Sequence, residues 1–456
     1  MNLEDFNNID RELEKENFEH KGIDLRGIVR DEIIYQIRRK KNEGIPRVSI
    51  SLKLKIRLLK GLLLTIKNLF QKKDFWIISN SDRRKKLDDT YVDRVASVIS
   101  DIYPDKTFFI ESNTVTQHKR NNRDMILSES FLQLLVKFFI FFNRKEYINT
   151  KWDFSNLEEK FDVNINVNFQ LLKFFGQYQA MNFFMKIKKK PKIVFLVYPT
   201  GYLGYIRKFK ELNIPVVELQ HGIIYKEHPS YNSSITIANR KLKPDYIFTY
   251  GKKDKVVLEE LNFLPKKNIV STGAYLLSYY RENDLKMSKY LEGILKGVFT
   301  NITIVTSTLA DTDELFSLCN DLAKNCPEFL FLLLPRSSEY KNKNKRENNF
   351  KVLDSDKTSI YELLNYCDIH VTQVSTCSLE ALFFNKKSLI YEKEKGTSFY
   401  RRNYDYINEI EYFSTVDEFK KQTSLPINLD NNNIDLLFEN RNYQKTEKNI
   451  QKILNN

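Results

Sequence analysis

The sequence predicts an α/β protein built from two Rossmann-like halves. Short apolar runs of strand length recur along the chain, and several are continuously apolar, which is typical of strands buried on both faces of a parallel sheet. Segments of helical length separate these runs, so strands and helices alternate in a βαβ rhythm. With 456 residues, the chain has room for two or three ordinary domains.

The first series of strands lies in the N-terminal part of the chain. We expect strands at 75–80, 107–111, 193–198, 216–219, 246–251 and 268–273. A charged extension precedes them, with apolar residues at helical spacing between Ile56 and Ile66. Residues 1–273 are therefore predicted to form a Rossmann-like domain with a helical N-terminal extension.

The rhythm restarts after a polar segment at 274–297, which we expect to be a linker. Further strands are predicted at 302–306, 329–334, 369–372 and 389–391, with helices over 311–325, near 358–366 and from 377. Residues 298–456 are therefore predicted to form a second Rossmann-like domain, which faces the first across a cleft.

One strand of the first series ends in residues suited to catalysis. The run VVELQHG at 216–222 delivers Gln220, His221 and Gly222 to a strand end, where open α/β sheets bind their ligands. Only five histidines occur in the chain, and His228 follows seven positions later. We predict that this loop forms an active-site wall. A histidine that is buried and hydrogen bonded in the core is the alternative interpretation.

Hydroxyl groups follow the first three strands of the second series. They are Ser307 and Thr308, then Ser337 and Ser338 beside Arg336, and finally Ser375 and Thr376. Because parallel strands share one carboxyl edge, these groups are expected to converge on one crevice. Thr376 begins a predicted helix, where free N–H groups and the helix dipole stabilise a phosphate. Glu380, one turn further on, is placed to meet a ribose diol, so the edge predicts a nucleotide site.

Several other chemistries are not indicated. Asp311 and Asp313 have the spacing of a divalent-cation pair, but they open a predicted helix, where acidic residues cap N–H groups. The chain has no GxGxxG, Walker, HExxH or GxSxG motif, so we expect no metal, no nicotinamide or other cofactor and no hydrolase elbow. Four cysteines without a CxxC pair suggest reduced thiols in the cytoplasm.

The formal net charge of +14 suggests an anionic partner or surface. The basic clusters at 38–41, 83–86 and 188–190 match no nucleic-acid-binding pattern, and we expect them to be solvated. No secretion signal begins the sequence, and the apolar run at 131–142 is too short to span a bilayer. We expect a cytoplasmic protein, with the inner face of the cytoplasmic membrane as its anionic surface.

Taken in order, these residues carry a family resemblance. The set Leu219-Gln220-His221-Gly222 with His228, then Gly273, Pro335-Arg336 and Ser375-Thr376-x-x-x-Glu380-Ala381 resembles bacterial cell-surface polysaccharide glycosyltransferases of the GT-B fold. It is also similar to the teichoic acid glycerophosphate polymerases and to capsule transferases that use CMP-activated acids. The resemblance covers residues 190–400. One departure is Leu334-Pro335, where several relatives have His-Pro, and Arg336 is expected to supply the missing positive charge.

The resemblance implies a glycosyltransferase that moves a sugar from a nucleotide-activated donor to a glycan or lipid-linked acceptor of the capsule or lipopolysaccharide type. His221 would be the base of an inverting, metal-independent displacement, provided that its pKa is near neutral. Ser307, Thr308, Arg336, Ser375, Thr376 and Glu380 would bind the donor, and Gln220, Gly222 and His228 would shape the acceptor loop. Alternatives are transfer of a polyol phosphate from a CDP-linked donor and, in another class, a nucleic-acid or membrane-surface binding protein.

Overall fold

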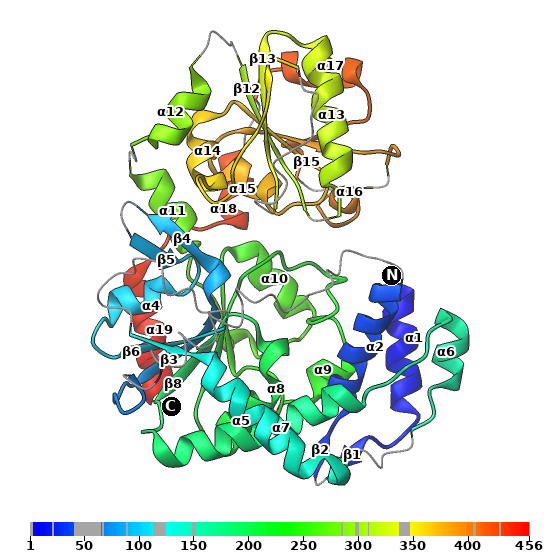
Figure 1. Ribbon diagram of the computed structural model, residues 1–456, viewed down its shortest axis with the longest axis vertical. Helices are drawn as coiled ribbons and strands as arrows, with labels where there is room; N and C mark the ends of the chain where they lie inside the picture. The colour runs from blue at the N-terminus through cyan, green and yellow to red at the C-terminus, as the bar shows by residue number, and fades with distance from the viewer. Residues whose placement is uncertain are drawn as a thin grey trace. The chain divides into compact units, whose positions relative to one another are not determined.

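The computed structural model describes residues 3–20, 22–40, 65, 68–87, 90–112, 125–147, 152–283, 286–296, 301–308, 310–336, 347–396, 398–404, 407–427 and 430–455. The chain divides into two compact units (Figure 1). The first comprises residues 1–250, 254–275 and 442–456, and the second comprises 251–253 and 276–441. Helix α19 (Tyr443–Asn455), which we had assigned to the second domain, is therefore part of the first unit.

The centre of the first unit is a parallel sheet that has seven strands within the described residues, in the order β11-β10-β9-β8-β3-β6-β7. The strands are β3 (Phe75–Asn80), β6 (Thr107–Ser112), β7 (Ile126–Ser128), β8 (Ile193–Leu196), β9 (Val216–Leu219), β10 (Tyr246–Thr249) and β11 (Ile269–Ser271). All six predicted strands of this half are confirmed, with shorter ends for three of them. β7 was missed because three residues are too short for a periodic signal.

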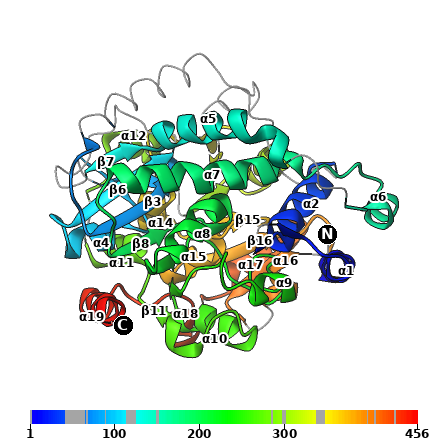
Figure 2. The ribbon, with the colours of Figure 1, turned by 90° about the horizontal axis from the view of Figure 1, so that it is seen from below.

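Helices cover this sheet and form the extension. They are α1 (Leu3–Glu14), α2 (Arg26–Lys40), α4 (Ser97–Ile102), α5 (Glu129–Tyr147), α6 (Ser155–Phe161), α7 (Asn168–Ile187), α8 (Leu203–Glu211), α9 (Ser234–Ala238) and α10 (Lys252–Glu260). Figure 2 shows α5, α7 and α8 as neighbours on one face of the sheet. A side chain at Gly204 would place its Cβ 2.3 Å from the main-chain oxygen of Phe174, so only glycine permits the close approach of α8 to α7.

The N-terminal helices have a core of their own and reach the candidate loop. Phe6, Ile9, Ile33 and other residues of α1 and α2 pack with apolar residues of α6 and α7, beside the small hairpin of β1 (Glu19–His20) and β2 (Ile23–Asp24). Arg30, which is fully buried, pairs with Asp10 and donates to the main-chain oxygen of Pro229 at 2.8 Å. The predicted helical stretch from Ile56 to Ile66 lies outside the described residues, apart from Thr65.

Two of the basic clusters each contain one buried residue, so the expectation that they are solvated is wrong for Arg84 and for Lys188 and holds for the exposed Lys189 and Lys190. Arg84 starts the hairpin of β4 (Arg84–Leu87) and β5 (Thr90–Asp93), and its guanidinium is buried against Glu111, with Nε and Oε1 2.5 Å apart. Lys188 is also buried, and its ammonium group donates to the main-chain oxygens of Asn68, Leu69 and Gln71. Sequence spacing gave no sign of these partners, because each lies far away along the chain.

The second unit holds a parallel sheet with six strands among the described residues, in the order β14-β13-β12-β15-β16-β17. The strands are β12 (Asn301–Thr306), β13 (Phe329–Leu334), β14 (Phe350–Val352), β15 (Ile369–Thr372), β16 (Lys387–Tyr391) and β17 (Ile410–Phe413). The four predicted strands are confirmed, and the edge strands β14 and β17 were missed. The buried apolar faces of β12, β13 and β15 pack on Leu315, Leu322 and neighbouring residues of the helix that follows β12.

The helices of this unit are α11 (Tyr275–Glu282), α12 (Lys289–Leu295), α13 (Thr312–Asn325), α14 (Ile360–Tyr366), α15 (Cys377–Phe383), α16 (Phe399–Asn403), α17 (Val416–Ser424) and α18 (Asn431–Leu437). The predicted helices over 311–325, near 358–366 and from 377 are confirmed as α13, α14 and α15. The segment 274–297, predicted as a linker, contains α11 and α12. Among the described residues, no helix is long and apolar enough to cross a membrane.

Each sheet has one point where the strand order reverses direction. In the first unit, the chain runs from β3 to β6 and β7 on one side and then from β8 to β9, β10 and β11 on the other. In the second, it runs from β12 to β13 and β14, and then from β15 to β16 and β17. The switch points therefore lie between β3 and β8 and between β12 and β15. Ligands of open α/β sheets bind at the carboxyl ends of strands at such points.

Candidate functional site

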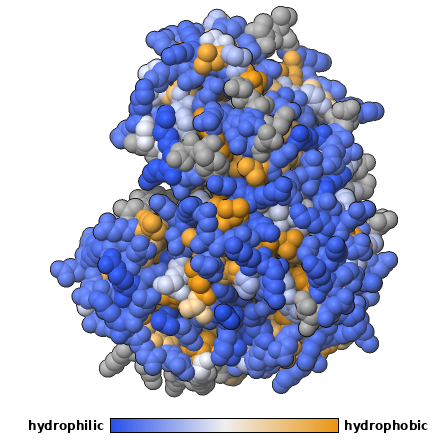
Figure 3. All heavy atoms as spheres, turned by 180° about the vertical axis from the view of Figure 1, so that it is seen from behind, coloured by the Kyte–Doolittle hydropathy of each residue, from blue (hydrophilic) through white to orange (hydrophobic). Residues whose placement is uncertain are grey.

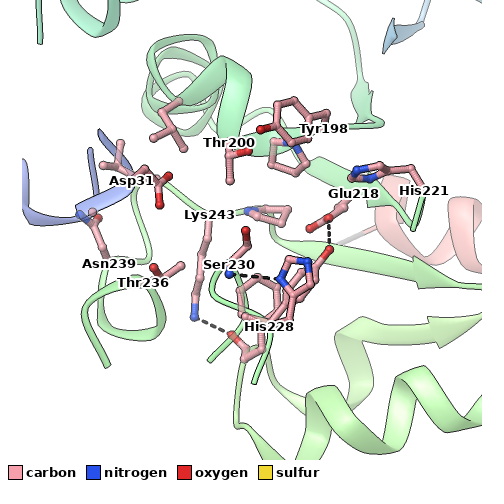
Figure 4. Close-up of a pocket in the computed structure, with 17 residues that line it drawn as sticks. Asp31, Tyr198, Thr200, Glu218, His221, His228, Ser230, Thr236, Asn239 and Lys243 are labelled. Atoms are coloured by element: carbon pink, nitrogen blue, oxygen red, sulfur yellow. Dashed lines mark hydrogen bonds between the residues drawn. The ribbon is translucent and has the colours of Figure 1, made fainter. Parts of the chain in front are cut away.

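The loops around the first switch point carry most of the candidate groups. Arg83 follows β3, Tyr198 and Thr200 follow β8, and His221 follows the neighbouring strand β9. A cavity of about 130 Å³ opens beneath them, and all of the residues that line it belong to the first unit. Figure 4 shows Tyr198, Glu218 and His221 on one side of it and Asp31, Thr236 and Asn239 on the other. The first unit thus has a partly open cavity beside its switch point, with polar side chains set in a mainly apolar lining.

Gln220 fixes the backbone of the candidate loop. Its side chain is buried, its amide nitrogen donates to the Gly222 main-chain oxygen and to Asp254 Oδ2, both at 2.8 Å, and its amide oxygen accepts from the Tyr250 N–H at 2.6 Å. These bonds tie the end of β9 to β10. Gln220 is therefore a positioning residue in this structure. Gly222 has no described atom within 4 Å of the place where a Cβ would lie, so crowding does not require glycine there.

The imidazole of His221 lines the cavity without a hydrogen-bond partner among the described residues. Its Nδ1 is buried, and the ring meets Tyr198 edge to face with centroids 5.6 Å apart. The loop is held through the main chain instead, because Arg94 Nη2 donates to the His221 carbonyl oxygen at 2.9 Å. A buried, unpaired ring nitrogen beside a cavity is available to a bound molecule.

The pKa of His221 differs from the near-neutral value that the predicted base required. Burial lowers it to about 3, and the positive charges of Arg83 and Arg94 contribute, followed by His228. The imidazole is therefore neutral at physiological pH and able to accept a proton. It is a weak base in this structure because burial and the positive charges of Arg83 and Arg94 disfavour its protonated form.

His228 lines the same cavity and is more tightly held. Its Nδ1 accepts a hydrogen bond from the Ser230 N–H at 3.2 Å, and its ring packs against Tyr225 and Tyr231. Burial, and then the charge of Arg38, lowers its pKa to about 4. Because Nδ1 is the acceptor, the neutral ring carries its proton on Nε2 and can donate from there.

Two carboxyl groups of the cavity were not predicted as site residues. Glu218 is 2% exposed, accepts a hydrogen bond from the Tyr231 hydroxyl at 2.7 Å, and has its pKa raised by burial to about 7. Asp31 comes from α2, and burial raises its pKa to about 6. The cavity therefore holds two carboxyl groups that titrate near neutrality. A charged residue in the otherwise apolar run VVEL was a usable signal for Glu218, whereas Asp31 reaches the site only through tertiary packing.

A lysine also reaches the cavity, but its charge is already solvated by the protein. The ammonium group of Lys243 donates to the main-chain oxygens of Ile237 and Phe263 at 2.7 and 2.6 Å. Burial lowers its pKa to about 8, and the charges of Arg240 and Lys210 act in the same direction. Lys243 therefore closes one wall of the cavity and is not aimed at a ligand.

The predicted donor residues lie around the switch point of the second sheet. Ser307 and Thr308 follow β12, Arg336 follows β13, and Ser375 and Thr376 follow β15, so all five lie at one carboxyl edge. Arg336 is exposed. Ser337 and Ser338 lie outside the described residues. The structure thus brings the described donor candidates to the same edge, as the parallel-sheet argument required.

Most of these hydroxyls already have local partners. Ser307 Oγ lies 2.9 Å from Thr312 Oγ1, and Thr308 Oγ1 accepts from the Ala310 N–H at 3.3 Å. Ser375 Oγ accepts from the Cys377 N–H at 3.3 Å. Asp311 directly precedes α13, but its side chain makes no capping bond to the helix and accepts instead from the Thr308 N–H at 2.6 Å, so the expected capping bond is not formed.

Thr376 and Glu380 belong to the short helix after β15. Thr376 directly precedes α15, and its side chain makes no capping bond. Glu380 is 7% exposed, and the Tyr361 hydroxyl donates to its Oε1 at 3.4 Å. The helix start at Thr376 and the one-turn spacing to Glu380 are therefore present. The side chain of Glu380 is buried, whereas we expected it to be exposed to a ribose diol.

Comparison with known proteins identifies the fold. The chain resembles the solved structure of S. aureus MnaA with UDP, at 10% identity and a TM-score of 0.52, over 84% of this chain and 97% of that one. It also resembles the glycotransferase of kitacinnamycin, at 9% identity and a TM-score of 0.51, over 84% and 100%. A third structure is the Methanocaldococcus jannaschii UDP-GlcNAc 2-epimerase in complex with UDP-GlcNAc and UDP, at 12% identity and a TM-score of 0.50, over 84% and 99%.

These likenesses, together with the two parallel sheets, show a two-domain Rossmann-like GT-B fold. No family model matches the sequence, and no curated protein matches it significantly. At these identities the comparisons speak for the fold alone, so the chemistry has to be argued from the side chains.

Proposed function

We propose that this protein is a glycosyltransferase that moves a sugar from a nucleotide-activated donor to a hydroxyl of a cell-surface glycan or lipid-linked acceptor. The observation that carries the proposal is the neutral imidazole of His221, which has no hydrogen-bond partner in the described part of the chain and lines a partly open cavity beside the first switch point. GT-B neighbours that carry UDP or UDP-GlcNAc support a nucleotide-sugar substrate.

In this proposal His221 takes the proton from the acceptor hydroxyl as its oxygen attacks the anomeric carbon. The bond between that carbon and the donor phosphate oxygen breaks, the configuration inverts, and the nucleotide leaves with the bonding electrons. General-base catalysis of this kind contributes about 10²- to 10⁴-fold in rate. Main-chain N–H groups, the hydroxyls of Ser375 and Thr376, and Arg336 would stabilise the departing phosphate without a metal.

The cavity of the first unit is the proposed acceptor pocket. Thr200, Ser230 and Asn239 line it with neutral polar groups, and Glu218 adds a carboxyl that is partly protonated near pH 7. Such groups donate to and accept from sugar hydroxyls. A cavity of about 130 Å³ accommodates one sugar unit better than an extended glycan, so the pocket would hold the terminal residue of the acceptor.

Two other activities use the same fold. The UDP-GlcNAc 2-epimerases among the neighbours make epimerisation of a nucleotide sugar a candidate, and transfer of a polyol phosphate from a CDP-linked donor is another. The products separate them. A glycosyltransferase releases nucleotide only with an acceptor, an epimerase needs no acceptor and keeps the nucleotide attached, and a phosphotransferase releases CMP with the polyol phosphate on the acceptor.

The decisive experiment combines a nucleotide panel with one variant. Thermal shifts with CMP, CDP, UDP and GDP identify the base, and filter binding with bulk RNA tests the nucleic-acid alternative. His221→Ala should lower transfer at least 100-fold while the melting temperature and nucleotide affinity stay close to wild type. Unchanged transfer by the folded variant would remove His221 from the chemistry. Loss of folding would support the core-histidine interpretation.

The proposal includes a peripheral position at an anionic membrane surface. Helix α5 exposes Leu134, Phe138, Phe141 and Phe142, the last two at 77% and 66%, and the chain carries a charge of +14. The face in Figure 3 is mainly hydrophilic, with separate hydrophobic patches. Phe141→Ser with Phe142→Ser should reduce sedimentation with anionic vesicles and leave transfer to a soluble acceptor unchanged. Equal sedimentation of both proteins would contradict this part of the proposal.

A further inference from the structure

Two arginines flank the β4–β5 hairpin and meet at His221. Arg83 immediately precedes β4 and Arg94 immediately follows β5, and the Arg94 N–H donates to the Arg83 main-chain oxygen at 3.2 Å. Arg94 reaches further and donates from Nη2 to the main-chain oxygen of His221 at 2.9 Å. Both guanidinium charges act on the imidazole. Neither arginine lines the cavity, so this group of positive charges is separate from the proposed sugar pocket.

The Arg83 side chain makes no hydrogen bond or ion pair within the described residues. The neighbouring Arg84 shows the contrast, because its guanidinium pairs with Glu111 and also donates to the Tyr91 main-chain oxygen at 3.0 Å. Burial lowers the pKa of Arg83, and the charge of Arg94 lowers it further. A half-buried guanidinium beside another cation is costly unless an anion joins it.

The charge of Asp93 partly offsets this cost, but its carboxylate makes no hydrogen bond or ion pair with Arg83. Asp93 Oδ1 accepts from the main-chain N–H groups of Val95 and Ala96, both at 2.9 Å, and its Oδ2 accepts from the Ser79 hydroxyl at 2.5 Å. These bonds commit the carboxylate to the turn that leads into α4. The buried Nδ1 of His221, on whose ring the charge of Arg83 acts, also lacks a hydrogen-bond partner among the described residues, and it lines a cavity that a ligand can enter.

We infer that Arg83, Arg94 and His221 form an oxyanion subsite in the first unit, which binds a phosphate or carboxylate group of the acceptor. Guanidinium groups form charge-assisted, often bidentate hydrogen bonds with both kinds of group. The assignment to the acceptor rests on the proposed function, in which donor phosphate binds at the edge of the second sheet. The binding of an oxyanion does not depend on it.

An anion bound at this subsite would change the proton affinity of His221, the proposed base. The groups that face the imidazole are Arg83, Arg94 and His228, with Tyr198 against the ring and Glu218, Asp31 and Lys243 around the shared cavity. An anion bound between the arginines compensates the charges that hold the imidazole in its neutral form, so it raises the proton affinity of His221. An acidic acceptor thereby strengthens the base that activates it.

The test uses inorganic phosphate and the full chain. Arg83→Gln is the variant of choice because the Arg83 side chain makes no hydrogen bond or ion pair with the described residues, and Arg402→Gln, which changes an exposed arginine of α16, is the matched control. Titration calorimetry should show at least tenfold weaker phosphate binding for Arg83→Gln and little change for Arg402→Gln. Undiminished phosphate binding by the folded Arg83→Gln variant would overturn the inference.

Histidine-labelled protein gives a second readout that does not need a variant of Arg83. The signal of His221 is assigned among the five histidines by its loss in His221→Gln. At pH 6 the nitrogen shifts of His221 should report a neutral ring, and saturating phosphate should protonate part of it, whereas chloride at equal ionic strength should not. Unchanged His221 shifts in phosphate would overturn the inference even if Arg83→Gln did not fold.

The source of the oxyanion is decided separately. Arg83→Gln should keep the wild-type nucleotide affinity and lose at least tenfold in kcat/KM for acceptors that bear a phosphate or carboxylate, with neutral acceptors little affected. A loss of nucleotide affinity instead would assign the subsite to the donor and overturn the acceptor assignment. Absence of all transfer would contradict the proposed function, and the phosphate measurements alone would then decide whether the subsite exists.

Discussion

The carboxyl edges of the two sheets differ in what their side chains are free to do. At the first edge the side chains of His221 and Arg83 make no hydrogen bond to the described residues, and burial raises the pKa of Glu218 and of Asp31 toward neutrality. At the second edge Ser307, Thr308 and Ser375 bond within their own loops. We therefore assign proton transfer to the first edge. The second presents ordered loops, main-chain N–H groups and the exposed Arg336 to a ligand.

Two histidines, one at each sheet, also differ in their surroundings. His370 lies in β15, is fully buried, and its Nε2 is 2.9 Å from Thr306 Oγ1 on the neighbouring strand. Burial lowers its pKa to about 3, the same value as for His221. His221 instead lines a cavity, and its ring makes no hydrogen bond to any described residue. Both histidines have a depressed pKa and a buried Nδ1 without a hydrogen-bond partner among the described residues, so neither property marks a functional histidine, and only the cavity distinguishes His221 from His370.

The largest expected effect on stability separates these two histidines. His370→Ala should lower the free energy of unfolding by about 2–4 kcal/mol, because it leaves a void in a closed core and an unpaired threonine hydroxyl. His221→Ala should cost less than about 1 kcal/mol, because its ring contributes no hydrogen bond within the described structure. Urea titrations of the two variants, followed by circular dichroism, measure both. Equal losses of unfolding free energy in the two variants would contradict the difference that we describe between the two histidines.

A smaller effect, on the pH dependence of stability, tests whether Glu218 at the first edge is protonated. Burial raises the pKa of Glu218 from its ordinary value to about 7, so its stabilising contribution is complete below the unfolded pKa near 4.5 and is lost as the pH rises through 7. Glu218→Gln should remove this loss, which amounts to at most about 3 kcal/mol by linkage. The stability difference between variant and wild type should therefore grow from pH 5 to pH 8.5.

Urea midpoints of both proteins at these two pH values check the sign. Histidine titration is common to both proteins and cancels in the difference. A difference that stays constant with pH would mean that Glu218 is ionised throughout and that its cavity is wetter than its burial indicates.

The smallest effects are expected at the second edge. Glu380→Gln and Arg336→Gln should each raise the donor KM about tenfold, equivalent to about 1.4 kcal/mol, with the acceptor KM unchanged. Initial rates at varied donor and acceptor concentrations separate the two constants. A raised acceptor KM with an unchanged donor KM would exchange the roles that we assign to the two edges.

The sequence predicted the repeating parts of this molecule well. Continuous apolar runs such as Phe329–Leu334 report burial on both faces, and the strands and the α13–α15 helices followed from them. The hydroxyls of the second edge came from the same rule, because parallel strands share a carboxyl end. The short edge strands β14 and β17 and the helices α11 and α12 lacked a periodic signal and were missed.

The first edge was only partly predictable for a physical reason. His221 and His228 are close in sequence and could be paired by inspection, whereas Asp31, Arg83 and Arg94 come from three separate segments. Arg83 and Arg84 are adjacent and were interpreted as one solvated cluster, yet Arg84 pairs with Glu111 and Arg83 acts on His221. The roles of the two arginines depend on which residues of other strands and loops lie beside them. Neither the charge pattern nor the spacing of the sequence predicts these neighbours.

Hydrogen exchange with and without the nucleotide that shifts the melting temperature most tests the central claim directly. The account predicts slower exchange in the loops after β12 and β15 of the second sheet, with the loop after β9 that carries His221 unaffected by nucleotide alone. Protection centred on residues 220–231, with none after β12 and β15, would contradict the division of labour between the two edges.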